Sequence, residues 1–445
     1  MHFAPIGLVL ALFTLLVSAL DVDWQKTQVL VVHDPDASPE RDVLSTLFQL
    51  NEDYNVTFAE YSDLDNLLFL GGDNLYNHVV FLPSSKRAVA AKELVNKHNL
   101  LEFFNNGGNV LAVGSSTNSL PDQVRLFLNE AGIFPAPKNF AVASHFDKKV
   151  TLNSKNSADS LILSEVPEID YDGTAALLSN SELVFPVIKA PKLSYCANPK
   201  DKYLTSEKTW SVGEQGFLAA AFQGLNNARG LWVGSIDLLA EELVQWVFQQ
   251  SGVLKLQFAH HYKTDEPNVS NNTLYRIKDE VYYTIGVSEL KNGKWVPFIP
   301  SRDDDVIQLS FKMLDPYQRL NLTLLGPGAS REYGENDLSI FYVEFKLPDH
   351  HGMFTFDLDY KRDGLSFIED KQIVAVRHLA NDEFKRSWDI SNSWLYVASA
   401  FFVVVAWFFF VVNFLFIGNE KPEVKTVKKT VKKNEEKAEK AEKSS

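Results

Sequence analysis

Residues 78–113, HVVFLPSSKRAVAAKELVNKHNLLEFFNNGGNVLAV, decide the fold class of the first half of this chain. The segment opens and closes with short apolar runs, His78–Pro83 and Asn109–Val113, which are typical of buried strands. Between them the apolar residues recur at helical spacing, and we expect a helix from Ser85 to Phe104. A strand, a helix and a second strand in this order predict a parallel sheet with helices on its faces.

The same alternation extends from Thr27 to about Gly252. Further buried strands are predicted at Gln28–His33, Val56–Tyr61, Gly216–Gln223 and Gly230–Gly234. Further helices are predicted from Ser38 to Leu50, over Pro121–Ala131 with Gly132 as its stop, and over Asp237–Gln250. Pro, Ser and Asn are frequent between residues 140 and 215, so strands there are expected only as additions to a sheet edge.

The period changes after about Val253, where apolar and polar residues alternate. Strands are predicted at Val281–Ser288, Val306–Met313, Leu320–Leu325, Ser339–Leu347, Met353–Tyr360 and Gln372–His378. In the clearest of these, Phe354, Phe356, Leu358 and Tyr360 would share one face. The pattern predicts an antiparallel β-sandwich.

Both ends of the chain carry membrane signals. The apolar run Ile6–Val17 is too short to span a bilayer and is followed by small residues, so we expect a signal peptide that is cleaved near Ala19. An uncleaved anchor stays open, because no Lys or Arg precedes this run. The uncharged stretch Trp394–Ile417 is long enough to cross a hydrocarbon core of about 30 Å.

The flanks of that stretch orient it. Trp388, Trp394 and Tyr396 fit an aromatic belt on one side, and Lys residues crowd the other, where Lys428–Lys433 would contact anionic headgroups. We therefore predict a single-pass type I protein with its bulk in the lumen. The predicted parts are a signal peptide (1–19), an α/β domain (20–252), a β-sandwich region (253–393), a transmembrane helix (394–417) and a cytosolic Lys/Glu-rich tail (418–445).

Composition excludes several classes of protein. The 445 residues carry a formal net charge of −14, which argues against a surface that neutralises phosphates and hence against nucleic acid as a partner. Cys196 is the only cysteine, so a disulfide framework and a Cys-based zinc site are excluded.

No set of residues predicts catalysis, a cofactor or a metal. Neither a Gly-x-Gly-x-x-Gly nor a P-loop follows His33-Asp34. Gly114–Asn118 is close to a nucleophile elbow but lacks its final Gly, which leaves Ser116 with an unidentified His as a minor alternative. Adjacent strand residues point to opposite faces, so His260-His261 and His350-His351 should not chelate. Two further expectations are a solvated turn at Asp303–Asp305 and a buried, inert Cys196.

Two sets of residues suggest modification and association. Four Asn-x-Ser/Thr sequons are N-glycosylation candidates: Asn55, Asn268, Asn271 and Asn321. In the apolar helix, Ser399, Ala406 and Asn413 are seven residues apart and form a stripe of small and polar side chains, which predicts packing against a partner helix.

Long strings along the chain resemble the forty-eight-kilodalton subunit family of the eukaryotic oligosaccharyltransferase. The strings are Arg125–Ile133, Gly216–Leu218 with Asn226–Arg229, Asp315–Arg319, Phe345–Asp349, Gly352–Phe356 with Asp359-Tyr360, and Arg377–Glu383 continuing to Arg386–Trp388. They occur in the family's order between Thr27 and Ile417.

The resemblance implies a non-catalytic subunit of the endoplasmic reticulum complex that transfers a preassembled glycan from dolichyl diphosphate to Asn in Asn-x-Ser/Thr. It implies a glutamine-amidotransferase-like α/β domain followed by β-sandwich modules. The implied partners are a multispanning catalytic subunit and ribophorin II-like and defender-against-death-like subunits. Two alternatives stay open: an independent lumenal glycosidase or glycosyltransferase, which needs a carboxylate pair in a cleft, and a sorting receptor, whose coat-binding signals the Lys/Glu tail does not show.

Overall fold

The computed structural model describes residues 27–35, 54–62, 67–88, 94–146, 149–158, 161–166, 168–201, 205–291, 293–302, 305–325, 337–384 and 392–419. The predicted signal peptide, the predicted helix Ser38–Leu50, Trp388 and the Lys/Glu-rich tail from residue 420 onward lie outside the described residues. The chain forms two compact units, Met1–Arg377 and His378–Ser445.

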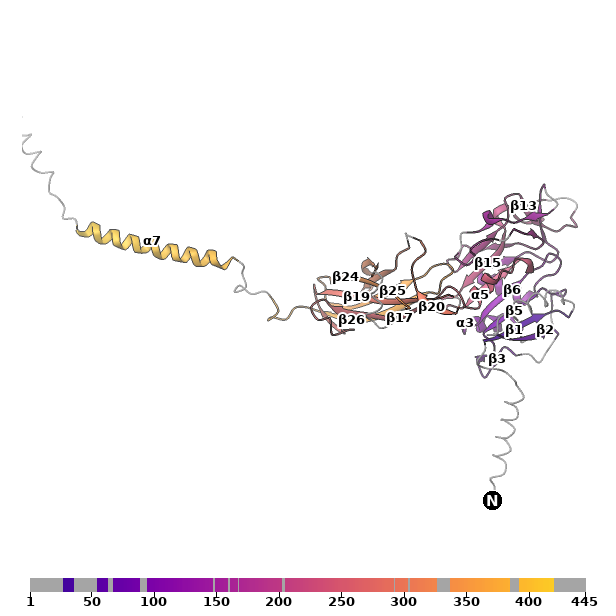
Figure 1. Cartoon of the computed structure of the whole chain (residues 1–445), viewed down its shortest axis with the longest axis horizontal. Coiled ribbons are helices and arrows are strands. Elements are labelled where there is room, and N and C mark those ends of the chain that lie inside the picture. Colours follow the sequence, from indigo (N-terminus) through magenta and orange to yellow (C-terminus); the bar gives the residue numbers. More distant parts are fainter. Residues whose placement is uncertain are drawn as a thin grey trace, which may run out of the picture. The chain divides into compact units, whose positions relative to one another are not determined.

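A nine-stranded mixed sheet forms the first half of the larger unit (Figure 1). Its strand order is β2-β1-β5-β6-β16-β15-β11-β7, and β12 also pairs with β15. The strands are β1 (Thr27–His33), β2 (Tyr54–Glu60), β5 (His78–Phe81), β6 (Asn109–Val113), β7 (Ile133–Pro135), β11 (Ala176–Leu178), β12 (Val184–Lys189), β15 (Phe217–Gln223) and β16 (Arg229–Val233). All six strands predicted for this region are therefore present.

The prediction of a parallel sheet is correct for one half of it and wrong for the other. Strands β2, β1, β5, β6 and β16 run parallel, whereas β15 is antiparallel to β16, and β11 and β12 are antiparallel to β15. The physical reason is the connection: a parallel crossover needs about a dozen residues, and β15 and β16 are joined by the tight turn 224–228. As expected, strands from the irregular region, β11 and β12, join the edge.

Helices cover both faces of this sheet, as predicted. Alternate strand residues such as Leu30 and Val79 pack with α3 (Lys97–Asn105) and α4 (Asp122–Ala131), and the others, such as Val29 and Val80, pack with α5 (Glu241–Val247). Helix α4 ends at Gly132 as predicted, because this glycine adopts φ +93°, a conformation that costs other residues energy.

The predicted starts of two helices are wrong. Helix α3 begins at Lys97 with Asn96 as its N-cap, not at Ser85, because the Ser85 hydroxyl donates instead to the carboxylate of Asp34 at 2.8 Å. The region predicted as one helix, Asp237–Gln250, contains a 3₁₀ turn, η3 (Ile236–Leu238), and the shorter α5.

Short elements complete this half of the unit. They are β3 (Phe69–Leu70), β4 (Asp73–Asn74), β8 (Ala141–Ser144), β9 (Val150–Thr151), η1 (Ser154–Asn156), β10 (Asp170–Tyr171), β13 (Ser194–Ala197), β14 (Thr209–Val212) and η2 (Gly213–Gln215). Strands β14, β13 and β8 form a separate antiparallel sheet.

Two five-stranded sheets form the second half, with orders β17-β19-β24-β23 plus β20, and β18-β26-β25-β21-β22. The strands are β17 (Val253–Lys263), β18 (Leu274–Arg276), β19 (Glu280–Lys291), β20 (Lys294–Pro297), β21 (Gln308–Lys312), β22 (Pro316–Asn321), β23 (Thr323–Leu324), β24 (Ser339–Lys346), β25 (Gly352–Tyr360) and β26 (Ile368–Arg377). Pairing is antiparallel except between β18 and β26.

The two sheets face each other across an aromatic core. Phe356 of β25 stacks on His261 of β17 and on Tyr283 of β19, with ring centroids 4.6 and 5.5 Å apart. The predicted inward face of β25 is confirmed, since Phe354, Phe356, Leu358 and Tyr360 are all buried. The predicted antiparallel β-sandwich is therefore present.

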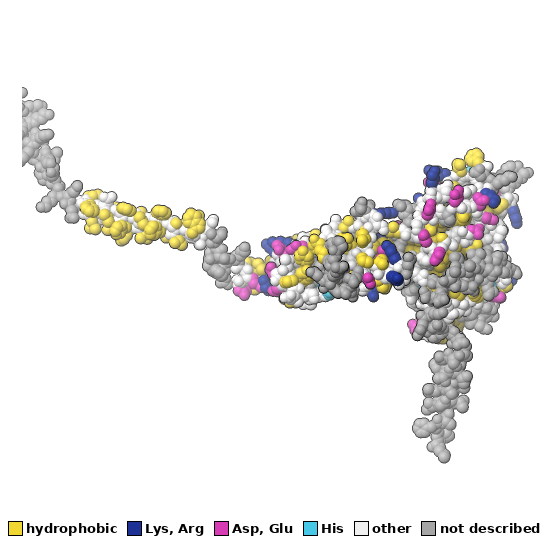
Figure 2. Space-filling view, viewed as in Figure 1, with side chains coloured by type: hydrophobic (Ala, Val, Ile, Leu, Met, Phe, Trp, Pro, Cys, Tyr) yellow, Lys and Arg dark blue, Asp and Glu magenta, His cyan; other side chains and the backbone are white. Residues whose placement is uncertain are grey.

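In its described residues, the smaller unit forms the helix α7 (Ser393–Asn419). Its segment Ser393–Ile417 has the length and composition of a membrane span, with a mean hydropathy of 2.7. Hydrophobic side chains cover the helix along its length (Figure 2).

Candidate functional site

The carboxyl ends of β1, β5 and β6 meet at one edge of the mixed sheet, the usual place for a ligand in such folds. Asp34, just after β1, accepts hydrogen bonds from Ser84 Oγ (3.2 Å), Ser85 N (2.9 Å) and Ser85 Oγ (2.8 Å). Burial by itself would raise the pKa of Asp34, but these hydrogen bonds outweigh it and the pKa is lowered. Asp34 is therefore an ionised anchor for the Ser84-Ser85 turn and is not suited to donate a proton.

The loop after β6 does not form a nucleophile elbow. Helix α4 begins only at Asp122, well after Ser116, and the loop is held by backbone hydrogen bonds between Ser84 and Ser119 in both directions. Within the described residues, no hydrogen bond joins Ser116 to a histidine. An elbow needs its serine on a sharp turn directly between strand and helix, and this geometry does not provide one.

Cys196 lies in β13 and is fully buried. Burial raises the pKa of its thiol to about 11, so the thiol stays protonated at neutral pH. The prediction of a buried cysteine is confirmed.

The histidine pair of β17 is split as predicted, whereas His350-His351 lies in the loop before β25. In β17, His261 points into the sandwich, where its Nδ1 lies 2.6 Å from the Tyr275 hydroxyl, and burial lowers its pKa to about 4. His260 points to the other face and stacks on Phe258. Among the described residues, no group of three or more His, Cys, Asp or Glu side chains is placed to hold a metal ion.

The acidic triplet is only partly described, and its described member is not simply solvated. Asp303 and Asp304 lie outside the described residues, but Asp305 accepts hydrogen bonds from the Tyr360 hydroxyl (2.7 Å) and Arg362 Nε (2.6 Å). The expected solvated turn is thus wrong for Asp305, because the sandwich supplies donors that are distant in sequence.

Asp305 lines a cavity of about 510 Å³ between the mixed sheet and the sandwich. Phe185 and Leu365 contribute apolar surface, and Arg362 and Asp363 contribute charge. Burial raises the pKa of Asp363, although Arg302 and Arg362 act in the opposite direction. Two carboxyl groups, Asp305 and Asp363, thus line this cavity.

Arg229 forms the centre of a joint between the mixed sheet and the sandwich. Its guanidinium is fully buried and donates four hydrogen bonds. The acceptors are the carbonyl oxygens of Trp246, Ser251 and Gly252, each at 2.7 Å, and Ser366 Oγ at 3.1 Å. Burial lowers the pKa of Arg229 to about 9, which still leaves it charged at neutral pH.

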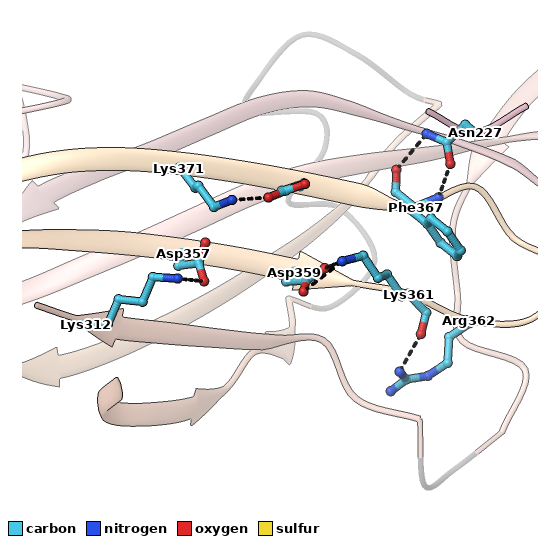
Figure 3. A network of polar contacts seen from close by, with 9 residues as sticks. Asn227, Lys312, Asp357, Asp359, Lys361, Arg362, Phe367 and Lys371 are labelled. Carbon is cyan, nitrogen blue, oxygen red and sulfur yellow. Dashed lines mark hydrogen bonds and ion pairs between the residues drawn. The ribbon is translucent and has the colours of Figure 1, made fainter. Parts of the chain in front are cut away.

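Neighbouring side chains extend this joint to the loop that precedes β26. Asn227 Nδ2 donates to the Phe367 carbonyl (3.1 Å) and the Phe367 amide donates to Asn227 Oδ1 (2.6 Å), which imitates a pair of strand hydrogen bonds (Figure 3). Gln223 Nε2 donates to the Leu365 carbonyl (3.0 Å), and Trp246 Nε1 donates to the Gly364 carbonyl (2.8 Å). These bonds link residues more than 100 positions apart and fix the two halves of the unit together.

Comparisons with known proteins identify the family. The family models for the OST48 N-terminal domain and the OST48 middle domain match residues 21–272 and 260–418. The chain belongs to the OST48 family. The predicted resemblance is therefore confirmed.

Relatives of this OST48-family chain include three named subunits. The chain is 35% identical to the dolichyl-diphosphooligosaccharide–protein glycosyltransferase subunit WBP1 of Saccharomyces cerevisiae, over 87% of this chain and 91% of that subunit. It is 30% identical to subunit wbp1 of Schizosaccharomyces pombe, over 86% and 90%. It is 28% identical to the 48 kDa subunit of the same enzyme from Drosophila melanogaster, over 81% and 85%.

The string Asn226–Arg229, one of those that resemble the OST48 family, forms the joint. In addition to the roles of Asn227 and Arg229, Asn226 Nδ2 donates to the Phe104 and Asn105 carbonyls at the end of α3. Sequence reasoning missed this role, because a polar run between two strands is typical of an exposed turn. The one signal available was an arginine directly before a strongly apolar strand.

The sequons of this OST48-family chain lie in different surroundings. Asn55 is half-buried on the edge strand β2 and donates to Gln28 Oε1 (2.9 Å), whereas Asn268, Asn271 and Asn321 are exposed. Asn321 ends β22 and accepts a hydrogen bond from Gln308 (2.9 Å).

The predicted stripe lies on α7 as its spacing requires. The Ser399 hydroxyl donates to the Tyr396 carbonyl of the same helix (2.8 Å). Within the described residues, the Asn413 amide makes no hydrogen bond.

Proposed function

We propose that this chain is a non-catalytic subunit of the oligosaccharyltransferase, the enzyme that transfers a preassembled glycan from dolichyl diphosphate to Asn in Asn-x-Ser/Thr of nascent proteins. The observation that carries the proposal is the 35% identity to the yeast subunit WBP1 over most of both chains. The other two relatives are also named as subunits of this enzyme.

The chemistry of the described residues supports a non-catalytic role. Asp34 accepts three hydrogen bonds from the Ser84-Ser85 turn on its Oδ2 atom, and Cys196 is protonated in the core. The end of β1, where an active site would be expected, thus holds an anchored side chain. Bond formation is assigned to a separate, multispanning subunit.

The proposed role is to hold neighbouring subunits. Of these, ribophorin II-like and defender-against-death-like subunits are the proposed contacts. We assign residues 20–252 to a glutamine-amidotransferase-like domain, 253–393 to the sandwich region, 394–417 to the membrane helix and 418–445 to the cytosolic tail, after a signal peptide of residues 1–19. The proposed location is the endoplasmic reticulum membrane, with the bulk of the chain in the lumen, and membrane lipid surrounds the helix.

Native purification tests the proposal. The tagged full chain, extracted in mild detergent, should be recovered with a multispanning subunit and with activity that transfers glycan to an acceptor peptide. Recovery as a lone monomer that turns over a sugar donor would overturn the proposal.

The alternative of an independent glycosidase or glycosyltransferase has one observation in its favour, the cavity that Asp305 and Asp363 line. That alternative requires one carboxyl group to stay protonated and the other ionised. Burial shifts the pKa of Asp363 upward, which is the direction that a general acid needs. The carboxylate of Asp305, however, is already bound by Arg362 and Tyr360 and is not free to act on a substrate.

A further inference from the structure

The outer face of the sheet that contains β17, β19 and β24 carries a row of aromatic side chains that stack in two groups. We define the aromatic row as Phe258, His260, Tyr262, Tyr282 and Tyr342, all of them half-buried. Phe258 stacks on His260, Tyr262 on Tyr282 and Tyr282 on Tyr342, with ring centroids 5.1, 5.5 and 5.8 Å apart and planes within 17° of parallel. The solvent face of an antiparallel sheet normally carries polar side chains, so this row is an unusual surface.

Strand β17 forms the edge of that sheet, and Asn271 lies against this edge beside the aromatic row. The backbone amide of Asn271 donates to the backbone carbonyl of His261 (2.7 Å), and the backbone amide of His261 donates to Asn271 Oδ1 (3.2 Å). The side-chain nitrogen Nδ2 then lies 3.4 Å from Nδ1 of His260, a member of the row. These bonds hold Asn271 at φ +55°, with Nδ2 directed to the rings.

We propose that Asn271 carries an N-linked glycan and that its first sugars pack on the aromatic row, beginning at His260. The faces of a pyranose ring present C–H groups, which are attracted to the negative faces of aromatic rings. The row supplies such rings next to the attachment atom. This inference rests on the lumenal placement proposed above.

The bonding of Asn271 is compatible with glycosylation. In that step Asn271 Nδ2 loses a proton and bonds to C1 of the sugar, while the C1–O bond to the lipid diphosphate breaks and the diphosphate leaves. Nδ2 keeps one hydrogen, and Oδ1 can still accept from the His261 amide. The hydrogen bonds that orient Asn271 therefore survive the modification.

Asn55 and Asn321 lack this arrangement. The Asn55 side-chain nitrogen donates to Gln28 Oε1, and Asn55 is half-buried. Asn321 lies on β22 of the other sheet, so a glycan there provides an internal comparison on the same molecule.

The test is site-resolved deglycosylation of the native full-length chain within its purified complex. Endoglycosidase would be added, and mass spectrometry would follow the loss of glycan at Asn271 and Asn321, with denatured protein as the reference for the intrinsic rates. A sugar packed on rings should be released about three- to tenfold more slowly at Asn271 than at Asn321, relative to the denatured reference.

Substitutions at the row identify the source of this protection. His260→Thr should abolish the slow release at Asn271, His260→Phe should preserve it, and His350→Thr, in an exposed loop, should leave it unchanged. If His260→Thr is not recovered, the unmodified chain decides whether the glycan is protected. The measure is then the ratio of the rate of glycan release at Asn271 in native protein to that in denatured protein. The inference would be overturned by equal relative rates of glycan release at Asn271 and Asn321, or by protection that persists in His260→Thr. It would also be overturned by a bare Asn271 on a chain that is glycosylated at Asn321. The absence of glycan at every sequon would instead overturn the lumenal placement.

Discussion

At the scale of single residues, Arg229 shows how this chain holds a buried charge. Its acceptors in the described structure are three backbone carbonyls and one hydroxyl, and its guanidinium lies 4.8 Å from the centroid of the Trp246 ring. A charge away from water is costly unless its donors are satisfied. Here the two terminal nitrogens donate to acceptors from two parts of the chain, whereas Nε is buried without an acceptor. Arg229 therefore stabilises the joint only when both parts are in place.

Replacing Arg229 with Met should destabilise the protein by about 2–5 kcal/mol, because four acceptors lose their donor. Arg229→Lys should lose less stability, because an ammonium group can reach some of these acceptors but cannot match the planar guanidinium. Chemical denaturation of the purified full chain in detergent would measure both. Arg319→Met, on the exposed side of β22, is the matched control and should change stability by less than about 0.5 kcal/mol.

His78 should make the fold sensitive to acid. It is buried and stacks on Phe248 with ring centroids 4.2 Å apart, and its Nδ1 lies 3.1 Å from the side-chain nitrogen of Asn109. Burial lowers its pKa from 6.5 to about 3. At a pH between these two pKa values, His78 binds a proton in the unfolded chain but not in the folded chain. Stability should therefore fall as the pH drops below about 6.5, by on the order of 2 kcal/mol from this residue at pH 4.5.

The measurement is the free energy of unfolding at pH 7 and pH 4.5 for the unmodified chain and for His78→Gln. The variant should lose less stability on acidification, because its side chain does not titrate. An equal loss in both proteins would show that His78 does not contribute to the acid response.

Ser116→Ala and Asp363→Asn should leave N-glycosylation in cells unchanged. Ser116 lies in a loop without elbow geometry, and Asp363 lines a cavity in a subunit to which we assign no bond formation. Glycosylation of reporter proteins would be compared with that in unmodified cells. Loss of transfer by an intact, assembled complex in either variant would support the enzyme alternative.

At the scale of elements, α7 should associate through one face. Ser399 and Asn413 lie on the predicted stripe, whereas Phe408 is nine residues from Ser399 and so about 180° around the helix. Asn413→Leu combined with Ser399→Leu should reduce recovery of membrane partners in mild detergent several-fold, because small and polar residues favour helix contact in lipid.

Phe408→Leu is the matched control for that double variant and should leave recovery unchanged. It alters the opposite face of the same helix and keeps the hydrophobicity needed for insertion. Unchanged recovery with the double variant would reject the stripe as a packing face.

The elements also show where sequence patterns fail. The six predicted strands of the mixed sheet follow from apolar runs. The direction of β15, by contrast, follows from the length of its connection, and the start of α3 follows from the partner that Ser85 finds in Asp34. Strand β17 was not predicted, although residues 253–263 precede the predicted strands of the sandwich. Its two adjacent histidines and Lys residues obscure the alternation of period two.

At the scale of the whole molecule, removing residues 394–445 should separate anchoring from folding. Unit Met1–Arg377 contains both cores and the joint, so the shortened chain should be released as a folded, soluble fragment. It should fail to join the complex, and glycosylation of many substrates should decrease. Normal glycosylation in cells that contain only this fragment would contradict the proposed function.

The sequence by itself determined the order of architectures, the apolar span at the carboxyl end, the buried face of β25 and the family, because hydrophobic period and long matching strings are local properties of the chain. Only the tertiary structure decided the mixed direction of the sheet, the joint around Arg229 and the position of Asn271 beside the aromatic row. Each of these depends on which distant backbone groups meet, as when Asn227 pairs with Phe367 across 140 residues. Local spacing carries no information about such partners, since they are selected by packing after the strands have paired.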